Sequence, residues 1–312
     1  MAKPLPRQTA LQQLKDFDFT RARVSLWVFK KRSAGGNALA FSACWVDIAP
    51  RLAKELKAIA KITRDSFTEV SDYGLLQQPN ETELLALASA GTQFQSLVDA
   101  TSGREEKHQA SNRKDLDNAA GYVVKIAAKG KILYCVRKAT SEWKSTKSSS
   151  LLNLVFVQQQ LDIEDDPVFR VARTFDFFAL DSYLLVANKR AFESLLNFKA
   201  TYENSFMELK QEPAFVNLFT TMAPLEVYVS TNAMQLRRMA VIRDKGLYRD
   251  TQYVARLRNV NGSRGWGIQF DVNGRIAPTG ETVRVILQVL LDHRLYSELS
   301  LATYDVPSTT PV

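Results

Sequence analysis

Apolar residues recur along the chain in patterns that predict both strands and helices. Apolar and β-branched runs at residues 23–29 and 39–48 predict a first strand pair, joined by a basic connection that contains glycine. Leu52, Leu56 and Ile59 then follow helical spacing, which predicts an amphipathic surface helix. The lysines expected on the outer side of this helix are Lys54, Lys57 and Lys61.

The later part of the chain mixes the same two patterns. Two turn signals, Lys129-Gly130 between residues 122–128 and 132–136, and Asn273-Gly274 further on, each predict a hairpin. Further strands are predicted at residues 151–157, 168–173, 182–186 and 299–306, and helices at residues 188–210, 232–245, 249–259 and 281–292. This pattern predicts an α+β fold with mixed or antiparallel sheets and flanking helices.

A polar stretch from Thr101 to Asn118 interrupts these patterns and is typical of a linker or long loop. We therefore expect two parts, an N-terminal α+β module at residues 1–118 and a C-terminal domain at residues 119–312. The chain has 312 residues, which fits about two domains of ordinary size.

Composition narrows the class of protein. Apolar residues make up 46% of the chain and charged residues 24%, as in a globular protein. Cys44 and Cys135 lie far apart in apolar runs, so we expect two reduced core thiols. No apolar run approaches the ~18 residues that a membrane span needs, and the first ten residues do not resemble a signal peptide. The expectation is a cytoplasmic protein whose membrane contact comes through a partner.

Residues typical of catalysis are sparse. His108 and His293 are the two histidines, and neither has a plausible local partner. The acidic run Asp162 to Asp166 lacks calcium-loop spacing, and the glycines Gly262, Gly265 and Gly267 read as a loop that leads into a strand at residues 266–271. Asp115 or Asp117 ahead of Glu142 and Lys144 is a poor match to a nuclease pattern. We expect no catalytic residue, no metal and no cofactor; a metal-dependent nuclease of unrecognised type stays open as the alternative.

Positive charge is concentrated in two segments of a chain whose net charge is +8. Residues 121–150 hold 7 basic residues and 1 acidic residue, with Tyr122, Tyr134 and Trp143 between them. Cations contact phosphates and aromatic rings stack on unpaired bases, so this segment is typical of nucleic-acid binding. Residues 234–264 hold 8 basic and 2 acidic residues, on two predicted helices that present arginine outward. The candidate nucleic-acid-binding residues are Lys138, Lys144, Lys147, Arg237, Arg238, Arg243, Lys245, Arg249, Arg256 and Arg258.

Two other interpretations of this charge remain open. Residues 151–233 hold 11 acidic against 6 basic residues, so these carboxylates could pair with the arginines internally or across a dimer. The chain could also be a scaffold of a membrane complex, its basic surface meeting anionic lipid headgroups or the partner, with DNA incidental.

From about Gly121 onward the order of features resembles the KwaB family, the soluble component of the two-gene Kiwa anti-phage defence system. Phe175-Asp176-Phe177-Phe178, then a strand, then Phe192-Glu193 at a helix start is the most telling stretch. The other matching stretches are GYVVKIAAKGKILYCVRKAT, IQFDVNGRIAP and RVILQVLLDHRLYSELSLATYDV. The three phenylalanines of the first stretch are expected in the core rather than on DNA.

The resemblance implies a cytoplasmic dimer that associates with a KwaA-like inner-membrane protein. It also implies binding to the DNA of an infecting phage, with interference in phage replication and late expression. It supplies no catalytic residues. Together with the charge distribution, it predicts non-sequence-specific DNA binding through the two basic segments, by occupancy rather than turnover.

Overall fold

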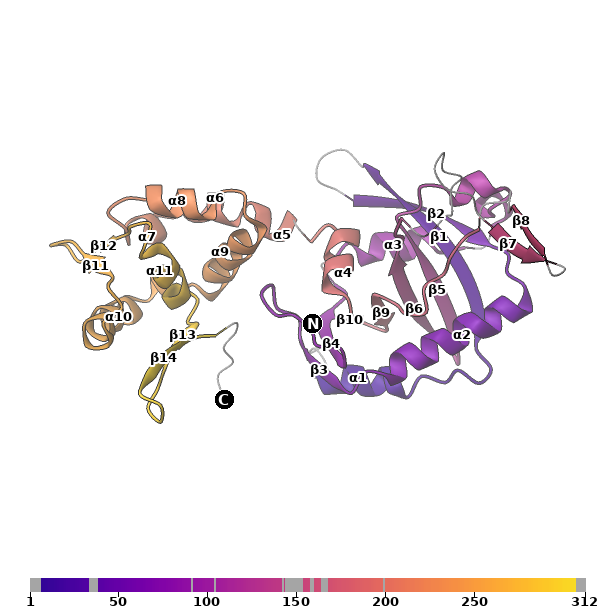
Figure 1. Cartoon of the computed structure of the whole chain (residues 1–312), viewed down its shortest axis with the longest axis horizontal. Coiled ribbons are helices and arrows are strands. Elements are labelled where there is room, and N and C mark those ends of the chain that lie inside the picture. Colours follow the sequence, from indigo (N-terminus) through magenta and orange to yellow (C-terminus); the bar gives the residue numbers. More distant parts are fainter. Residues whose placement is uncertain are drawn as a thin grey trace. The chain divides into compact units, whose positions relative to one another are not determined.

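The computed structural model describes residues 7–33, 39–90, 92–103, 105–141, 143, 154–157, 160–163, 168–198 and 200–306. It divides into two compact units (Figure 1). Unit 1 comprises residues 1–73 and 79–197, and unit 2 comprises residues 74–78 and 198–312. The fold is α+β, as the sequence predicts.

Unit 1 is built on an eight-stranded mixed sheet in the order β2-β1-β5-β6-β9-β10-β4-β3. Neighbours pair antiparallel except β3 and β4, which are parallel. The strands are β1 (Arg23–Ser33), β2 (Leu39–Val46), β3 (Glu69–Asp72), β4 (Glu83–Ala88), β5 (Gly121–Ala128), β6 (Lys131–Lys138), β9 (Phe177–Leu180) and β10 (Tyr183–Val186). A separate hairpin joins β7 (Leu154–Val157) to β8 (Gln160–Ile163).

The sequence predicts a domain boundary at residue 118, but the sheet of unit 1 extends across that position. β1 pairs with β5 along Arg23 to Phe29, so strands from both sides of that position share one set of backbone hydrogen bonds. The polar stretch before it is not a linker either. It contains the short 3₁₀ helices η1 (Glu106–His108) and η2 (Arg113–Leu116), and the Trp45 indole of β2 donates to the Glu105 carbonyl at 3.0 Å. The stretch therefore packs along the edge of the sheet.

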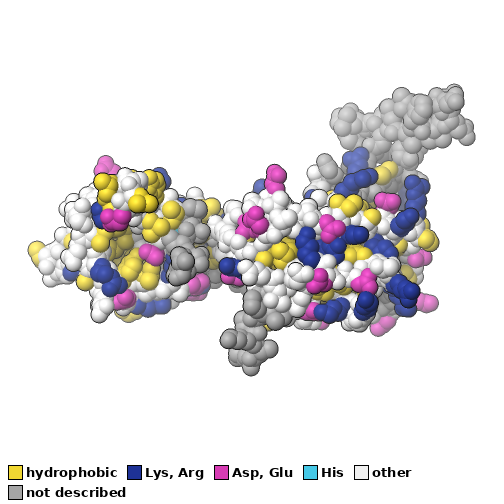
Figure 2. Space-filling model, turned by 90° about the horizontal axis from the view of Figure 1, so that it is seen from below, with side chains coloured by type: hydrophobic (Ala, Val, Ile, Leu, Met, Phe, Trp, Pro, Cys, Tyr) yellow, Lys and Arg dark blue, Asp and Glu magenta, His cyan; other side chains and the backbone are white. Residues whose placement is uncertain are grey.

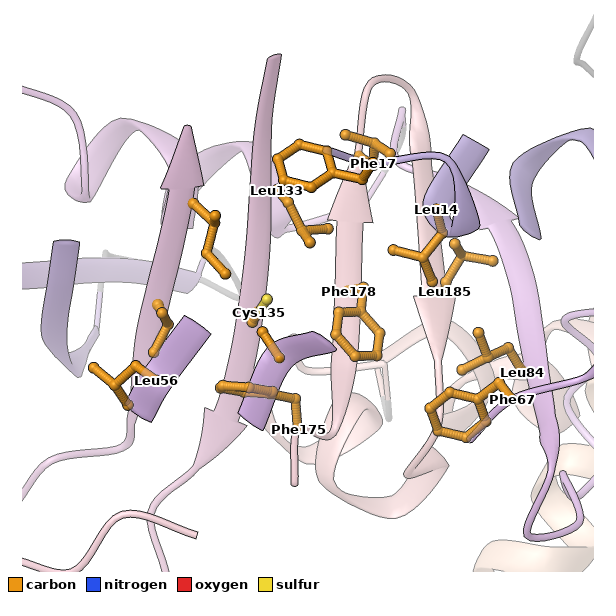
Figure 3. Packing of buried hydrophobic residues seen from close by; sticks show 14 of the residues in the cluster. Leu14, Phe17, Leu56, Phe67, Leu84, Leu133, Cys135, Phe175, Phe178 and Leu185 are labelled. Carbon is orange, nitrogen blue, oxygen red and sulfur yellow. The ribbon is translucent and has the colours of Figure 1, made fainter. Parts of the chain in front are cut away.

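Helices cover both faces of the sheet, because alternate strand residues point to opposite sides. α1 (Arg7–Lys15) and α2 (Pro50–Asp65) pack on one face, where Leu14 and Leu56 join Leu133, Phe178 and Leu185 in a single core (Figure 3). α3 (Phe94–Ala100) and α4 (Lys189–Leu195) lie on the other face. There Phe177 contacts the rings of Phe94 and Phe192 at centroid distances of 6.2 and 5.1 Å.

The middle aromatic run fills the core, as the sequence predicts. Phe175 and Phe178 belong to the core beneath α1 and α2, and Phe177 faces α3 and α4. All three are at most 2% exposed. The hairpin predicted at Lys129-Gly130 is also confirmed, with φ values of 49° and 78° at its two turn residues. Positive φ at both central positions is the geometry that matches the twist of paired strands.

Unit 2 is mostly helical around a second core. The core contains Phe215, Leu225, Met239, Ile276 and Leu287, each fully buried. The elements are α5 (Ala200–Glu203), α6 (Ser205–Gln211), α7 (Pro213–Val216), α8 (Ala223–Val229), α9 (Ala233–Lys245), η3 (Leu247–Arg249), α10 (Thr251–Arg264), α11 (Val283–Leu290) and the hairpins β11 (Gln269–Phe270) with β12 (Ile276–Ala277) and β13 (Arg294–Ser297) with β14 (Ala302–Asp305).

Three local predictions need correction. The long helix at residues 188–210 is broken into α4, α5 and α6, because Asn197 adopts a left-handed φ of 55° just after α4. The described residues 168–173 are not a strand; the Ala172 amide donates instead to the Tyr122 hydroxyl at 3.0 Å. Gly262 lies inside α10 rather than in a loop, and the helix ends at Gly265, whose φ is 61°.

Candidate nucleic-acid interface

The predicted arginines of unit 2 lie on α9, η3 and α10, and several of them are ion-paired. Arg243 contacts Glu208 at 2.5 Å and Asp244 at 2.9 Å. Arg249 donates from Nε and Nη2 to the two carboxylate oxygens of Glu212, at 2.5 and 2.9 Å. Glu208 and Glu212 belong to the acidic segment, so the internal pairing left open by the sequence occurs at these two arginines. Arg256 lies 3.7 Å from Asp250 and remains exposed.

The other predicted cations of unit 2 form contacts with an aromatic ring, an amide side chain or a backbone carbonyl. Arg237 stacks over the Tyr202 ring at 5.0 Å, and Arg238 donates to Gln235 at 3.1 Å. Lys245 donates to the Leu291 carbonyl at 2.6 Å, and Arg258 to the Gly274 carbonyl at 2.5 Å. These contacts hold the four side chains in place in unit 2. They also tie each cation to the packing around it.

The first basic segment is dispersed. Lys144 and Lys147 lie outside the described residues. Lys129 and Lys131 pair with Asp18 at 2.9 Å and Asp181 at 2.7 Å, and Lys125 donates to the Thr101 carbonyl. Lys138 ends β6 and donates to the Ser194 hydroxyl at 2.9 Å.

The aromatic residues of this segment are not available for flat stacking on bases. Tyr122 and Trp143 are 2% and 7% exposed, and their rings stack on each other with centroids 5.3 Å apart. Burial, as the main cause, raises the pKa of the Tyr122 hydroxyl to about 12. Tyr134 is half-buried against Phe94 of α3. The expectation of an aromatic stacking track therefore fails, because these rings stabilise unit 1.

α2 carries a group of cations that the sequence places on a surface helix but does not mark as a binding site. Pro50 starts the helix, and Leu56 and Ala60 bury its inner side against the sheet. Its outer side leaves Arg51, Lys54 and Lys61 exposed and Lys57 half-buried. Arg173 lies beside the end of the helix, where the Thr63 hydroxyl donates to its carbonyl at 3.5 Å. We call Arg51, Lys54, Lys57, Lys61 and Arg173 the α2 basic face.

The cations of the α2 basic face differ from the arginines of unit 2 in their partners. Over the part of the chain that the structure describes, none of these five side chains forms an ion pair or hydrogen bond. Figure 2, seen from the side on which α1 and α2 lie, shows many Lys and Arg side chains on this face of unit 1, with Asp and Glu side chains between them. The charge of the α2 basic face is therefore available to an anion.

A second group of cations lies at the end of the sheet where β6 stops and β9 begins. Arg137 donates to Asp176 at 2.9 Å and to Thr174 at 3.2 Å, and the Lys138 amide donates to the other Asp176 oxygen at 2.7 Å. Asp176 is 1% exposed, and its burial raises the pKa of the carboxyl despite these donors. Asp176 thus fixes the Arg137 guanidinium at the sheet end.

Lys31 of β1 and Lys138 of β6 converge on Ser194 of α4. Lys31 donates to the Ser194 carbonyl and Lys138 to its hydroxyl. Burial first, and then the positive charge of Lys138, lower the pKa of Lys31. Two ammonium groups held this close repel each other, and a bound anion would relieve that repulsion.

Two cavities open at this sheet end. One, of about 430 Å³, is bordered by Arg137, Lys138, Trp143 and Arg170. The other, of about 270 Å³, is bordered by Lys138, Asp176, Asn188 and Arg190. Both include the segment from Arg137 to Thr140. Arg170 lies in the connection before β9 and Arg190 in the first turn of α4, and no periodic pattern in the sequence singles them out.

Metal ligands and membrane-spanning helices were the remaining features to place in the described residues, together with the two thiols. Within the described ranges, no group of three or more His, Cys, Asp and Glu side chains is arranged to hold a metal ion. Glu164, Asp165 and Asp166 lie outside those ranges. Among the described helices, none is long and apolar enough to cross a bilayer. Cys44 and Cys135 are both free thiols.

Comparison with known proteins identifies a family. The family model described as "Kiwa protein KwaB-like" matches residues 116–300, which include β5, β6, β9, β10 and most of unit 2. No curated protein and no solved structure matches the chain.

Proposed function

Because this chain belongs to the Kiwa protein KwaB-like family, whose model covers more than half of it, we propose that it acts in anti-phage defence by holding DNA without reading sequence. The family makes it a component of Kiwa anti-phage defence. DNA binding, dimer formation and a KwaA-like inner-membrane partner that recruits this protein to the membrane are further parts of the proposal. On this proposal, DNA held on basic surfaces blocks phage replication and late expression.

The observation that carries the proposal is the unpaired charge of the α2 basic face. A cation already paired with a carboxylate must give up that contact before it meets a phosphate, whereas Arg51, Lys54 and Lys61 give up only water. Arg51 and Lys61 are separated by about 15 Å along the helix at 1.5 Å per residue. Duplex DNA carries one negative charge per about 1.7 Å of its axis, so this helix can meet several phosphates at once.

The predicted cations of unit 2 and Lys138 remain part of the proposed interface, with unequal weight. Arg238 donates to the neutral Gln235 side chain and Arg258 to the Gly274 carbonyl, so neither side chain has to leave a carboxylate in these contacts before it meets a phosphate. Arg243 and Arg249 must exchange Glu208 and Glu212 for a phosphate. We therefore assign the larger share of the nonspecific attraction to unit 1.

Salt titration tests the proposal. Binding of the full-length protein to a labelled duplex is measured at several salt concentrations, with a single-stranded oligonucleotide of the same length in parallel. Neutralising about six phosphates gives a log–log slope of about −5, since each phosphate contributes roughly −0.9. The variant R51E/K54E/K61E loses up to three contacts, so its slope is expected to be shallower by about two to three.

The matched control is R21E/K114E/R284E, which changes the net charge equally through exposed cations outside the α2 basic face. It is expected to keep a slope near that of the unaltered protein. If R51E/K54E/K61E keeps the full slope, the α2 basic face is not the interface. If the unaltered protein binds neither oligonucleotide at low salt, the DNA proposal itself is wrong.

One incubation distinguishes the proposed DNA binding from the nuclease alternative. On the proposal, purified protein leaves phage DNA intact in the presence of Mg²⁺ or Mn²⁺, because the protein acts by occupancy and not by turnover. Metal-dependent cleavage that persists in R51E/K54E/K61E at protein concentrations that saturate the DNA would make the chain an enzyme.

A further inference from the structure

The two cavities at the sheet end combine size, charge and an apolar wall in one place. The larger, about 430 Å³, falls within the range of pockets that hold small molecules. It shares Arg137, Lys138, Ala139 and Thr140 with the smaller cavity of about 270 Å³. Together they form a site that runs from Trp143 and Arg170 at one end to Asn188 and Arg190 at the other.

Charge in this site is strongly unbalanced. Arg137, Lys138, Arg170 and Arg190 border it, and Asp176 is the one carboxylate among the described lining residues. Arg170 and Arg190 are exposed and, in the described part of the chain, form no side-chain ion pair. A ligand that enters the site therefore meets an excess of positive charge.

Asp176 does not cancel this excess for an incoming ligand. Its oxygens already accept from the Arg137 guanidinium and the Lys138 amide, and the Asn188 side chain also donates to it. The carboxylate is buried behind these donors. Asp176 therefore acts as a positioning residue that orients Arg137, while Arg170 and Arg190 keep their donors for the ligand.

The charge favours a terminal phosphate over one inside a chain. A phosphomonoester carries a charge of about −1.5 to −2 near neutral pH, whereas each backbone phosphodiester carries one charge. Arginine side chains are suited to such a group, because a guanidinium donates two parallel hydrogen bonds to its oxygens.

The aromatic side of the larger cavity indicates what is attached to the phosphate. Trp143 borders it, held by the Tyr122 ring behind it and by a 2.9 Å hydrogen bond from its indole to the Leu116 carbonyl. Phe169 packs against the same indole with centroids 5.6 Å apart. A rigid indole edge beside a cationic pocket is suited to a planar base or a sugar ring.

We propose that this sheet-end site binds a nucleoside 5′-phosphomonoester, present either as a free nucleotide or as the phosphorylated end of a DNA strand. The phosphate lies at the Arg137–Thr140 segment that both cavities share, where Asp176 holds Arg137 ready and where Arg170 reaches it from one cavity and Arg190 from the other. The Trp143 wall of the larger cavity contacts the nucleoside. The strand-end form rests on the proposed DNA binding; the free-nucleotide form does not. In the strand-end form the α2 basic face holds the DNA backbone and the sheet-end site holds its terminus.

Calorimetric titration of the full-length protein with 2′-deoxyadenosine 5′-monophosphate tests the site. Deoxyadenosine and inorganic phosphate are titrated in parallel and are expected to bind at least tenfold more weakly, since each lacks one part of the recognised group. The variant R170A/R190A is expected to lose roughly tenfold in affinity per arginine, as for hydrogen bonds to charged groups. Both side chains are exposed, so its melting temperature is expected to stay unchanged.

The control variant R21A/R284A removes the same charge elsewhere and is expected to bind the nucleotide as the unaltered protein does. The proposed site is wrong if the unaltered protein does not bind the nucleotide, or if both variants lose the same amount of nucleotide affinity. Duplexes that carry a 5′-phosphate or a 5′-hydroxyl then distinguish a phosphorylated strand end from a free nucleotide as the ligand. Preference for the 5′-phosphate that R170A/R190A abolishes supports the strand end; equal binding of the two duplexes assigns the site to the free nucleotide.

Salt-dependent binding of the 5′-hydroxyl duplex reports on the proposed function alone. If that binding persists while the mononucleotide does not bind, the sheet-end inference fails and DNA binding stands. If the mononucleotide binds and the duplex does not, DNA binding fails and the sheet-end site stands.

Discussion

The Arg137 guanidinium lies 2.9 Å from the buried carboxylate of Asp176, and this contact joins the end of β6 to the start of β9. Asp176 also accepts the Lys138 amide at 2.7 Å. Its own amide and carbonyl continue the connection: the amide donates to the Val136 carbonyl, and the carbonyl accepts from the Ala187 and Asn188 amides. One residue therefore holds the ends of three strands in place.

Asp176→Asn is expected to destabilise the protein by about 2 kcal/mol. The amide offers one acceptor oxygen where the carboxylate offers two, so either Arg137 or the Lys138 amide loses its partner in a buried setting. Chemical denaturation monitored by circular dichroism measures the change. Asp181→Asn is the matched control, because the Asp181–Lys131 ion pair is exposed and is expected to contribute at most about 0.5 kcal/mol. Equal effects of the two substitutions would contradict the role given to Asp176.

Gly121→Ala is expected to cost about 1–3 kcal/mol through overpacking at the start of β5. A Cβ at this position would meet the Arg137 carbonyl at 2.5 Å and the Phe29 ring at 2.6 Å. The control is Gly262→Ala inside α10, where a Cβ meets nothing within 4 Å. Alanine is expected to stabilise that helix by about 0.5–1 kcal/mol. Denaturation midpoints that shift in the same direction would contradict this close packing between β5 and its neighbours.

The sequence predicts features that depend on neighbouring residues. The Lys129-Gly130 and Asn273-Gly274 hairpins follow from turn chemistry, and the outward lysines of α2 follow from helical spacing. The sequence also predicts that the phenylalanines at 175, 177 and 178 lie in the core, and they do. In each case, the residues that determine the feature lie close to one another in the sequence.

Features that depend on distant residues could not be predicted in the same way. Arg249 and Glu212 are 37 positions apart, and only the fold shows that they pair. β5 pairs with β1 across the polar stretch that the sequence predicts to be a linker. Arg137, Arg170 and Arg190 come together because β6, β9 and β10 are neighbours in the sheet, an order that strand patterns do not determine.

Acid is expected to weaken the Arg249–Glu212 contact in a defined pH range. Hydrogen bonds from Arg249, opposed by burial, lower the pKa of Glu212 from 4.5 to about 2. As pH falls, the unfolded chain therefore takes up this proton first. The stabilisation is complete above the unfolded pKa and is lost as pH falls through the folded one.

The free energy of unfolding of the unaltered protein is thus expected to fall more steeply than that of Glu212→Gln between about pH 5 and pH 2.5. Urea denaturation at a series of pH values measures the two slopes. Glu281→Gln, which removes a carboxylate that forms no ion pair in the described part of unit 2, is expected to keep the steep dependence of the unaltered protein. A Glu212→Gln profile parallel to the unaltered one would show that this contact does not contribute.

The same substitution tests whether carboxylates of unit 2 restrain its arginines from binding DNA. Reversing Arg237, Arg238 and Lys245 together is a poor test, because Arg237 stacks on Tyr202 and Lys245 holds the Leu291 carbonyl, so lost affinity could reflect altered packing. Glu212→Gln instead frees Arg249 while leaving every cation in place. If Arg249 reaches a phosphate, DNA affinity is expected to rise several-fold and the salt slope to steepen by about 0.9. Glu281→Gln adds the same net charge, so an equal gain in both variants would assign the effect to overall charge and remove Arg249 from the interface.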